Sequence, residues 1–421
     1  MQGTKPTILL LAALVGFSAF LSIVAPAFPA SKEKVLYHFH GNDGANPYAV
    51  SLVFDASGNL YGTTSGGGSG GGGTVFQLAP QENGKWSEKV LRNFSYTQGN
   101  GGALPAAGVI LDSTGNLYGT ASNNGATGHG AVFELTPGAN GKWTEEILTD
   151  FGDGKPGAGP FASVIFDAEG NLYGTGSFGG AHGDGTVFQL TPGANGRWAI
   201  KTLHSFHGSD GSRSFAGVIF DGSGNVYGTT TGGGAYSGCQ DDVGCGTVFQ
   251  LSPSGSGKWT EKVLHSFGKG DDGQTPDAGL ILNAAGNLYG TTYYGGGHGQ
   301  GIVFELIPSA NGKWSEKVLH NFCAVHGCAD GANPYAGLVA DQLGNLYGTA
   351  VQGGTNGKGV VFKLTPGAKR KWKEEVLHSF GGTGDGAYPV GGLTFDKAGN
   401  LYGTTEAGGA SDNGTVFEIS P

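Results

Sequence analysis

The chain has 421 residues, a formal net charge of −10 and 85 glycines, and only 13% of its residues are charged. Aromatic residues make up 11% of the chain, which is more than disordered chains usually contain, and the glycines follow no collagen-like period. The longest run of lysine and arginine covers only residues 369–371, and basic residues are not clustered elsewhere, so the composition argues against a nucleic-acid-binding surface and favours many short strands joined by tight turns.

The first 30 residues are typical of an export signal. Lys5 supplies a positive charge, an apolar stretch covers residues 8–24, and small residues at Ala25, Ala27 and Ala30 offer cleavage positions. An uncleaved membrane anchor is the alternative, but the apolar stretch is shorter than the roughly 20 residues that a span requires. We therefore predict a signal peptide over residues 1–30 and a soluble mature protein that is secreted or extracellular, with the periplasm as a second location.

One string, Gly-Asn-(Leu/Val)-Tyr-Gly-Thr, recurs through the rest of the chain. Its seven tyrosines are Tyr61, Tyr118, Tyr173, Tyr227, Tyr289, Tyr347 and Tyr402, and they lie 54 to 62 residues apart. Each copy also contains a Val-Phe string, with Phe76, Phe133, Phe188, Phe249, Phe304, Phe362 and Phe417. Self-similarity at a fixed period indicates a repeat architecture.

Each repeat contains four short apolar runs bounded by glycine, proline and asparagine, which are strand signals. In the fourth repeat these runs cover residues 217–221, 225–230, 247–251 and 259–267. Four strands per repeat and seven repeats predict an all-β, seven-bladed propeller with antiparallel strands. An open solenoid is the alternative, but it needs polar capping repeats that neither end resembles.

The two ends of the chain predict how the ring closes. The last repeat stops after its third strand, at residues 414–421, and residues 31–39 match the fourth strand of other repeats. The N-terminal strand can therefore complete the last blade and leave no unpaired edge there. Each complete connection from a third to a fourth strand carries one tryptophan: Trp86, Trp143, Trp198, Trp259, Trp314 and Trp372. We predict a single domain over residues 31–421.

The string Asp-x-x-Gly-Asn resembles metal chemistry at first sight. Its first residues are Asp55, Asp112, Asp167, Asp221, Asp341 and Asp396, with Asn283 in the fifth copy. Each copy offers too few oxygen donors for a calcium loop of the EF-hand kind. Asp and Asn both cap turns through their side chains, so we interpret the string as a hairpin turn.

Four fourth-strand histidines occupy one repeat position, namely His204, His265, His320 and His378, and Tyr37 aligns with them. Replacement by an aromatic residue indicates packing and a hydrogen bond. Residues on separate outer strands also lie far apart, so we do not expect a shared catalytic site.

Two sets of loops open on the same face of a propeller, and we call this face the rim. The loops from fourth to first strands carry Asp43, Asp153, Asp210, Asp272, Asp330 and Asp385, with Asn100 and Gly101 in the second copy. The loops from second to third strands carry His129, His182 and His298. These residues are our candidate ligand site, with a divalent cation such as calcium as a further possibility. The alternative is that Asp-Gly only makes the turn.

Known catalytic and cofactor motifs are absent from the sequence. The glycine tract at residues 66–73 lacks the Lys-Ser/Thr ending of a phosphate loop. There is no Gly-x-Ser-x-Gly elbow, His-Glu-x-x-His pair or zinc-binding Cys/His set. We therefore predict no catalytic residue, no metal ligand and no resident cofactor.

The four cysteines form two close pairs in the two longest rim loops. In an exported chain we expect local disulfides, Cys239–Cys245 and Cys323–Cys328, which stiffen these loops. A zinc site with four thiolates would require the two loops to meet.

The repeated strings, with Gly-Gly-Gly, Leu-Thr-Pro and Gly-Lys-Trp between them, resemble the bacterial GloVer-type (choice-of-anchor) extracellular tandem-repeat family. The resemblance covers residues 31–421 and implies export and a propeller-like fold, but it brings no established activity or catalytic residue. No apolar tail or sorting signal follows Pro421, so we do not expect attachment to the cell surface. A weaker similarity to kelch repeats supports the blade topology only.

Two functions compete at this stage, because propellers host both. The first is a secreted binding or scaffold module that engages a glycan or a protein through its rim. The second is an extracellular polysaccharide hydrolase or lyase that uses rim carboxylates or histidines. In either case we expect a monomer with no nucleic-acid partner and no membrane attachment after signal cleavage.

Overall fold

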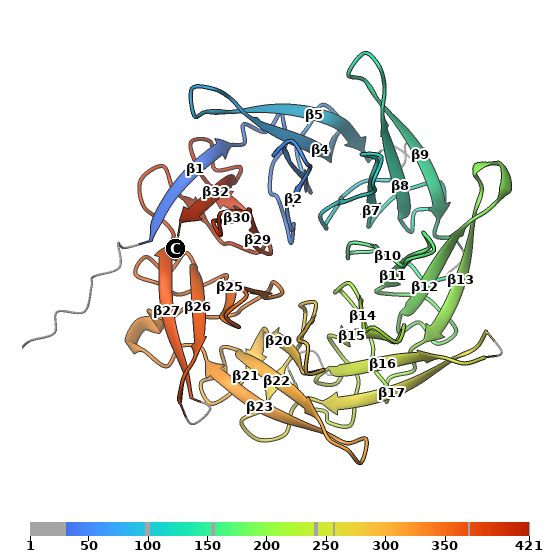
Figure 1. Cartoon of the computed structure of the whole chain (residues 1–421), viewed down its shortest axis with the longest axis vertical. Coiled ribbons are helices and arrows are strands. Elements are labelled where there is room, and N and C mark those ends of the chain that lie inside the picture. Colours follow the sequence, from blue (N-terminus) through green and yellow to red (C-terminus); the bar gives the residue numbers. More distant parts are fainter. Residues whose placement is uncertain are drawn as a thin grey trace, which may run out of the picture. The chain divides into compact units, whose positions relative to one another are not determined.

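Seven four-stranded antiparallel sheets surround a common axis in the computed structural model of the protein, within residues 31–421 (Figure 1). The structure describes residues 31–96, 102–152, 156–239, 243–255, 257–368 and 371–420. The predicted signal peptide, Asn100, Gly101 and Asp153 lie outside these residues. Among the described residues the only helical segments are two short 3-10 turns, η1 (Ala194–Gly196) and η2 (His326–Cys328). The predicted seven-bladed propeller is confirmed.

Each blade runs from an innermost first strand to an outermost fourth strand. The first strands are β2 (Val53–Phe54), β6 (Ile110–Leu111), β10 (Ile165–Phe166), β14 (Ile219–Phe220), β19 (Ile281–Leu282), β24 (Val339–Ala340) and β29 (Thr394–Phe395). The second strands are β3 (Leu60–Thr64), β7 (Leu117–Ala121), β11 (Leu172–Gly176), β15 (Val226–Thr230), β20 (Leu288–Thr292), β25 (Leu346–Ala350) and β30 (Leu401–Thr405).

The outer strands are longer. The third strands are β4 (Gly71–Pro80), β8 (Ala131–Pro137), β12 (Thr186–Pro192), β16 (Thr247–Pro253), β22 (Ile302–Pro308), β26 (Val360–Pro366) and β32 (Thr415–Ser420). The fourth strands are β5 (Trp86–Ser95), β9 (Trp143–Asp150), β13 (Trp198–Ser205), β17 (Trp259–Ser266), β23 (Trp314–Asn321), β27 (Trp372–Ser379) and β1 (Lys32–His38). Two small extra ladders pair β18 (Gly273–Gln274) with β21 (Tyr294–Gly295) and β28 (Gly386–Ala387) with β31 (Ala407–Gly408).

The first strands are shorter than the sequence predicts. In the fourth blade we expect a strand over residues 217–221, whereas β14 pairs with β15 only at Ile219–Phe220. The first strand has a sheet partner on one side only, and the residues that precede it lie along the axis instead of in the ladder.

The Asp-x-x-Gly-Asn string forms the hairpin turn between first and second strands, as predicted. Asp55 Oδ1 accepts hydrogen bonds from the backbone N–H groups of Ser57 (2.8 Å) and Asn59 (2.9 Å), and Oδ2 accepts one from the Tyr61 hydroxyl (3.0 Å). These bonds outweigh the effect of burial, which alone would raise the pKa of Asp55, so this pKa is lowered. Asn283 caps its own turn with the same Oδ1 acceptor.

The Tyr-Gly-Thr glycine and the Val-Phe phenylalanine pair across the second and third strands. In blade four, Gly228 lies opposite Phe249, and a Cβ on Gly228 would lie 2.5 Å from the Phe249 ring. Only glycine leaves room for this ring, which is why the two strings recur together.

Aromatic contacts join each blade to the next. The phenylalanine that ends a fourth strand packs edge-on against the third-strand phenylalanine of the following blade, as Phe206 does on Phe249 with centroids 5.1 Å apart. Farther out, the tryptophan of one blade contacts the repeat tyrosine of the preceding blade, as Trp259 does on Tyr173 at 6.2 Å. The hydrophobic clusters likewise span neighbouring blades, so each blade buries its surface against the next.

The N-terminal strand closes the last blade, as predicted. β1 pairs antiparallel with β32, from Lys32 opposite Ser420 to His38 opposite Thr415, and the sheet order is β1-β32-β30-β29. Phe39, which follows β1, is fully buried against Phe76 of the first blade. The repeat tyrosines at the other blade boundaries contact a tryptophan, as Tyr289 contacts Trp372. At the boundary between blades six and seven, where β1 has no tryptophan, Tyr347 contacts Phe395 instead.

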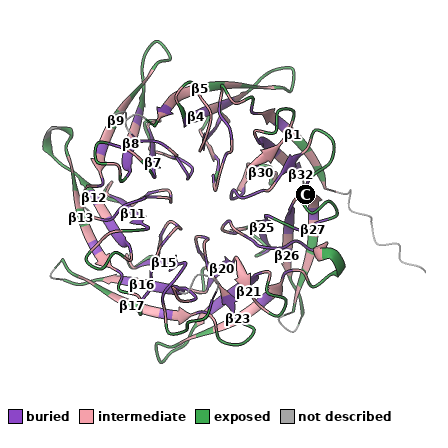
Figure 2. Cartoon of the chain, turned by 180° about the vertical axis from the view of Figure 1, so that it is seen from behind, coloured by how far each residue is buried: buried purple, intermediate pink, exposed green. Residues whose placement is uncertain are grey.

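The two predicted sets of rim loops do meet at one end of the strands. Their backbones pair in every blade, as Ala45 does with Gly66 and Ser212 with Gly232. The second strands are buried throughout, whereas the hairpin tips between third and fourth strands are exposed (Figure 2).

Candidate functional site: the axial cavity

The described rim aspartates each pair with the fourth-strand residue of their own blade. We call these pairs the outer ring: Tyr37–Asp43, His204–Asp210, His265–Asp272, His320–Asp330 and His378–Asp385. In three of them the histidine Nε2 lies 3.0 Å from the aspartate Oδ2, and the Tyr37 hydroxyl donates to Asp43 at 2.6 Å. The predicted hydrogen bond is thereby confirmed at four of these five positions, whereas His320 Nε2 lies 3.5 Å from Asp330 Oδ2 and has no hydrogen-bond partner among the described residues.

Asp210 shows what the outer ring does for its loop. Its Oδ1 accepts the backbone N–H of His207 at 2.9 Å, while its Oδ2 contacts His204. Burial alone would raise the pKa of Asp210, but these hydrogen bonds and the two imidazoles together lower it. The aspartate thus ties the end of the fourth strand to the loop that follows it.

A glutamate from the next blade lies beside each outer-ring pair. Burial, and then repulsion from the neighbouring aspartate, raises the pKa of Glu88, Glu261, Glu316 and Glu374 to about 7. Among the described residues, the Oε1 atom of each of these four glutamates is buried without a hydrogen-bond partner.

One such cluster has a spacing that a metal ion could use. Ligand atoms of Glu33, His378 and Asp385 lie within 4.8 Å of one another. Calcium takes six to eight oxygen ligands, and this cluster offers two carboxylates and an imidazole. Asp385 also accepts backbone hydrogen bonds from Gly381 (3.1 Å) and Gly386 (2.6 Å), so its carboxylate is already engaged.

The rim histidines are exposed on the loops from second to third strands. His182 faces His207 with ring centroids 5.8 Å apart, and His298 is close enough to help lower the pKa of His320, after the larger effect of burial. His129 is exposed beside Asn124. The described rim candidates are therefore spread over several blades, and two of the histidines, His182 and His298, lie near the aspartate pair of their own blade.

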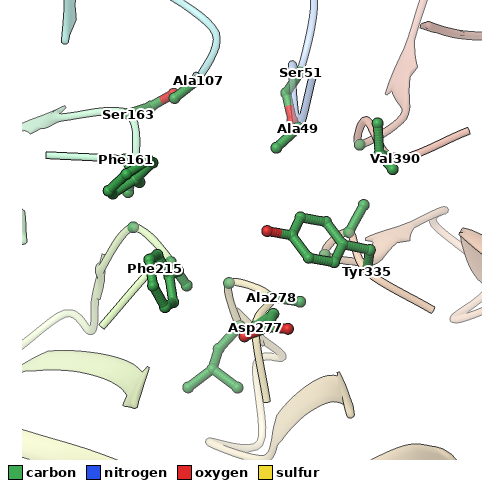
Figure 3. Close-up of a pocket in the computed structure, with 18 of the residues that line it drawn as sticks. Ala49, Ser51, Ala107, Phe161, Ser163, Phe215, Asp277, Ala278, Tyr335 and Val390 are labelled. Atoms are coloured by element: carbon green, nitrogen blue, oxygen red, sulfur yellow. The ribbon is translucent and has the colours of Figure 1, made fainter. Parts of the chain in front are cut away.

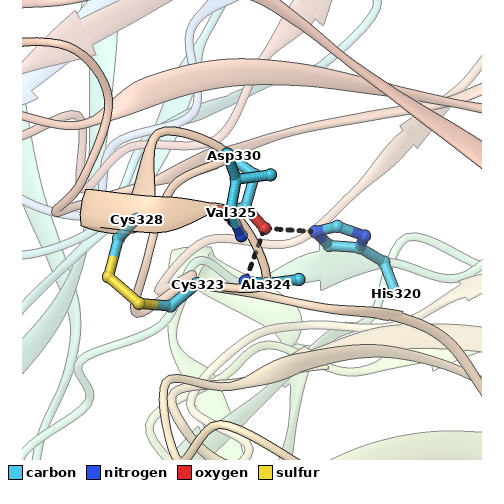
Figure 4. Close-up of a disulfide and its surroundings, with 6 residues drawn as sticks. All are labelled: His320, Cys323, Ala324, Val325, Cys328 and Asp330. Atoms are coloured by element: carbon cyan, nitrogen blue, oxygen red, sulfur yellow. Dashed lines mark hydrogen bonds and ion pairs between the residues drawn. A yellow bond between two sulfur atoms is a disulfide. The ribbon is translucent and has the colours of Figure 1, made fainter.

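Both predicted disulfides are formed. Cys239–Cys245 lies in the loop between β15 and β16, and Cys323–Cys328 lies in the loop after β23. Figure 4 shows that the second disulfide closes the turn whose backbone faces Asp330: the N–H of Ala324 donates to Asp330 at 2.9 Å, and His320 lies 3.5 Å from it.

A cavity of about 250 Å³ lies on the axis, where the rim loops lead into the first strands. Its wall includes Tyr48. Figure 3 shows four more of the lining residues, Phe161, Phe215, Asp277 and Tyr335. None of the described rim candidates lines this cavity.

Each blade contributes to the wall one residue at the same repeat position, and we call these residues the axial ring: Tyr48, Ala106, Phe161, Phe215, Asp277, Tyr335 and Val390. A proline precedes this residue in every blade except the fourth, and an alanine follows it in every blade except the seventh. The flanking residues repeat while the axial residue changes, and this variation is the signal that the sequence analysis missed.

Two aromatic clusters flank the cavity. On one side, Phe161 and Phe215 contact each other at 5.3 Å, and both contact Phe178 of a rim loop. On the other side, Tyr48 and Tyr335 lie 5.5 Å apart, and the Tyr48 hydroxyl donates to that of Tyr335 at 2.9 Å. The four cavity-lining rings are half-buried, so part of each remains open to the cavity.

Asp277 is the charged residue of the cavity wall, which includes no other acidic and no basic side chain among the described residues. The Thr231 hydroxyl donates to its Oδ1 at 2.7 Å. The pKa of Tyr335 is raised far above its usual value by burial first, and also by Tyr48 and the nearby Asp277 charge. The cavity thus combines aromatic walls with one carboxylate on one side.

The chain matches a family model over residues 26–241 and 239–421. The chain belongs to the Gloeobacter/Verrucomicrobia repeat family. The family match thus covers all seven blades and agrees with the resemblance found in the sequence. No curated protein matches the chain.

The helices in the described ranges lack the length and hydropathy that a membrane crossing requires. Both disulfides of this family member are of a kind that persists in oxidising compartments.

Proposed function

We propose that this protein is a secreted binding module that engages a glycan or protein ligand on its rim face, and that part of the ligand enters the axial cavity. The observation that carries the proposal is the axial ring, which places different side chains at one repeat position around a cavity. Ligand sites are typically concave, apolar and aromatic, with a few polar groups that orient the ligand. The two disulfides support secretion.

Size and rigidity also support a binding role. A cavity of about 250 Å³ falls just below the range of about 300–1,000 Å³ that is usual for drug-sized ligands. It suits a small molecule, or one group at the end of a larger ligand that also contacts the rim around His129, His182 and His298. Pre-formed walls reduce the entropy cost of binding.

The alternative is an extracellular polysaccharide hydrolase or lyase. Glycoside hydrolysis usually requires two carboxyl groups about 5–10 Å apart. Asp277 is the sole carboxylate among the described residues of the cavity wall, and the described rim aspartates are held in the outer ring. These observations favour binding over catalysis.

The test uses a variant that fills the cavity without disturbing the blade. Ala106→Phe places in blade two the residue that blades three and four already have at this position, Phe161 and Phe215. The intact secreted protein and the variant are screened against a glycan array and a soluble fragment library, with reducing-end release measured in parallel. We expect binding without turnover for the intact protein, and a loss of binding of about tenfold or more when the cavity is filled.

Leu343→Ser serves as the control, because Leu343 is 82% exposed and lies away from the cavity. Equal binding by Ala106→Phe and the intact protein would reject the cavity as the site. Product release that Asp330→Ala or His298→Ala abolishes would replace the binding proposal with the enzyme alternative.

A further inference from the structure

The side chains that line the axial cavity indicate the charge of the ligand that it would bind. The faces of aromatic rings are electron-rich, and their edges are electron-poor. Phe161, Phe215, Tyr48 and Tyr335 line the cavity in two pairs. Figure 3 shows Asp277 between Phe215 and Tyr335. Aromatic rings around a carboxylate make an environment that stabilises positive charge.

We propose that the axial cavity binds an organic cation, a quaternary or primary ammonium group that lies among these four rings and is paired with Asp277. The inference rests on the proposed binding function and names the ligand class of the same cavity. Quaternary ammonium groups are bound by aromatic cages of this composition, since they are attracted to ring faces and need no hydrogen bond.

The polar inventory of the cavity favours a cation over a sugar. A sugar ring presents many hydroxyls, each of which needs a partner when it leaves water. The Ser163 hydroxyl already donates to the Gly108 carbonyl at 2.8 Å, and the Tyr48 hydroxyl already donates to Tyr335. The wall is otherwise mostly Ala, Gly, Val, Leu and Ile, so few side chains remain to pair with sugar hydroxyls.

The charged residues near the cavity also favour a cationic ligand. Glu406 lies close enough to Tyr48 to contribute to its raised pKa, after the larger effect of burial. Lys358, a nearby cation, is outside the cavity wall and donates to the Tyr388 hydroxyl at 2.6 Å. Arg213 also lies outside the wall. The chain as a whole carries a formal charge of −10, which attracts cations over a longer range.

The size of the cavity limits the ligand. A volume of about 250 Å³ equals about eight waters at roughly 30 Å³ each. This space accommodates a trimethylammonium head and a short alkyl chain, whereas an oligosaccharide would have to remain mostly on the rim.

The test compares a cation with a neutral molecule of the same shape. Choline and 3,3-dimethyl-1-butanol differ only in the charged nitrogen, which is a carbon in the alcohol. Titration of the full secreted protein, followed by calorimetry or by NMR, should give choline an affinity about tenfold higher or more. Equal affinities would overturn the inference.

Two variants assign the preference to its source. Asp277→Asn keeps an oxygen for the Thr231 hydroxyl and removes the charge, so choline should bind about tenfold more weakly while the alcohol changes less than about twofold. Phe215→Leu removes one ring and should weaken choline by about threefold or more. Asp271→Asn is the control, because this exposed carboxylate lies in the same loop outside the cavity and should change neither affinity.

A second arm distinguishes the sources of the cation. Phosphocholine carries the same cation as part of a lipid head group, next to a phosphate that Asp277 and Glu406 would repel. Tighter binding of phosphocholine would indicate a lipid head group as the ligand. Tighter binding of choline would indicate a free quaternary ammonium compound. Either result supports the inference only if Asp277→Asn weakens the binding of both ligands.

The outcomes separate the two proposals. If the alcohol and choline bind equally and Ala106→Phe abolishes both, the cavity is a binding site but not one for cations. If Asp277→Asn leaves choline binding unchanged at an unchanged melting temperature, the inference is wrong whatever other ligands the cavity takes. If Ala106→Phe changes no binding at all, the proposed function itself fails.

Discussion

The outer ring and the axial ring use the same sevenfold scaffold in opposite ways. At the outer ring nearly the same pair recurs, with histidine or tyrosine on the strand and aspartate on the loop. At the axial ring the backbone recurs but the side chain changes, from Ala106 through Phe215 and Asp277 to Tyr335. A residue that recurs in every blade stabilises the blade structure. A residue that differs from blade to blade is not needed for that structure and can contribute to ligand binding.

The difference also explains where asymmetry can arise in a symmetric repeat. Outer-ring residues contact one neighbouring blade, so each must satisfy the same local geometry. Axial residues from different blades face a common space, and Tyr48 bonds to Tyr335 across 287 positions of sequence. The single charged residue of the axial ring, Asp277, makes the electrostatic potential of the cavity more negative on one side.

The largest expected effect comes from removing the strand that completes the scaffold. Deletion of residues 31–39 removes β1, the outer-ring Tyr37 and the buried side chains of Leu36 and Phe39. Loss of these core side chains costs several kcal/mol each, so the melting temperature should fall by on the order of 10 °C. Scanning calorimetry on the truncated chain, compared with a chain that begins at Ser31, measures the effect.

An unchanged melting temperature after this deletion would mean that β1 does not close the ring. The axial substitution Val390→Tyr provides the contrast. Val390 is 4% exposed, so the larger tyrosine side chain there should cost about 1–3 kcal/mol and lower the melting temperature by only about 2 °C.

A smaller effect is expected from breaking one outer-ring pair. His265→Ala leaves Asp272, whose side chain is 7% exposed, without its imidazole partner. An unpaired buried acceptor costs about 1–3 kcal/mol, and the melting temperature should fall by about 2 °C. His265→Tyr should restore most of this loss, because Tyr37 makes the equivalent bond to Asp43.

The outcome that would contradict the outer-ring assignment is a His265→Tyr variant as unstable as His265→Ala. Neither variant should change ligand binding, because His265 does not line the axial cavity. A change in affinity would mean that the two rings are coupled.

Most of the scaffold can be predicted from the sequence, because the strand and turn positions found in one repeat apply to the other six. The strand strings, the hairpin turns, the closing strand and both disulfides follow from local patterns whose partners are near in sequence or fixed by the period. The first strands were expected to be longer, since the apolar run at residues 217–221 does not show that only Ile219 and Phe220 enter the ladder. That boundary depends on how closely the blades approach the axis.

The axial cavity could not be predicted in the same way. Constant positions define the repeat, whereas the axial position varies from blade to blade, so the repeat pattern does not mark Asp277 or Tyr335. The recurrence of the rim aspartates suggests a ligand site. In the structure this recurrence reflects their bonds to fourth-strand residues such as His204. Which side chains share the cavity follows only from ring closure, which brings together residues from distant blades.

The smallest effect concerns the glutamates beside the outer ring. Burial, followed by repulsion from Asp272, raises the pKa of Glu316 to about 7, whereas an unfolded glutamate titrates near about 4.3. Between these values the folded protein binds more protons than the unfolded chain, so stability falls as the pH rises. Glu88, Glu261 and Glu374 act in the same direction.

The turn aspartates set the acid limit, because the pKa of Asp55 and its equivalents is lowered and their contribution is lost as the pH falls below about 3.8. The melting temperature should therefore be highest near about pH 4. Glu316→Gln keeps the neutral form at every pH, so it should raise the melting temperature at pH 8 by about 1–2 °C and leave it nearly unchanged at pH 4. The exposed Glu82→Gln is the control and should change neither value. If Glu316→Gln shows the same difference between pH 4 and pH 8 as the intact protein, the glutamates beside the outer ring do not carry the pH dependence, and the contrast with the axial carboxylate would have to rest on hydrogen bonding alone.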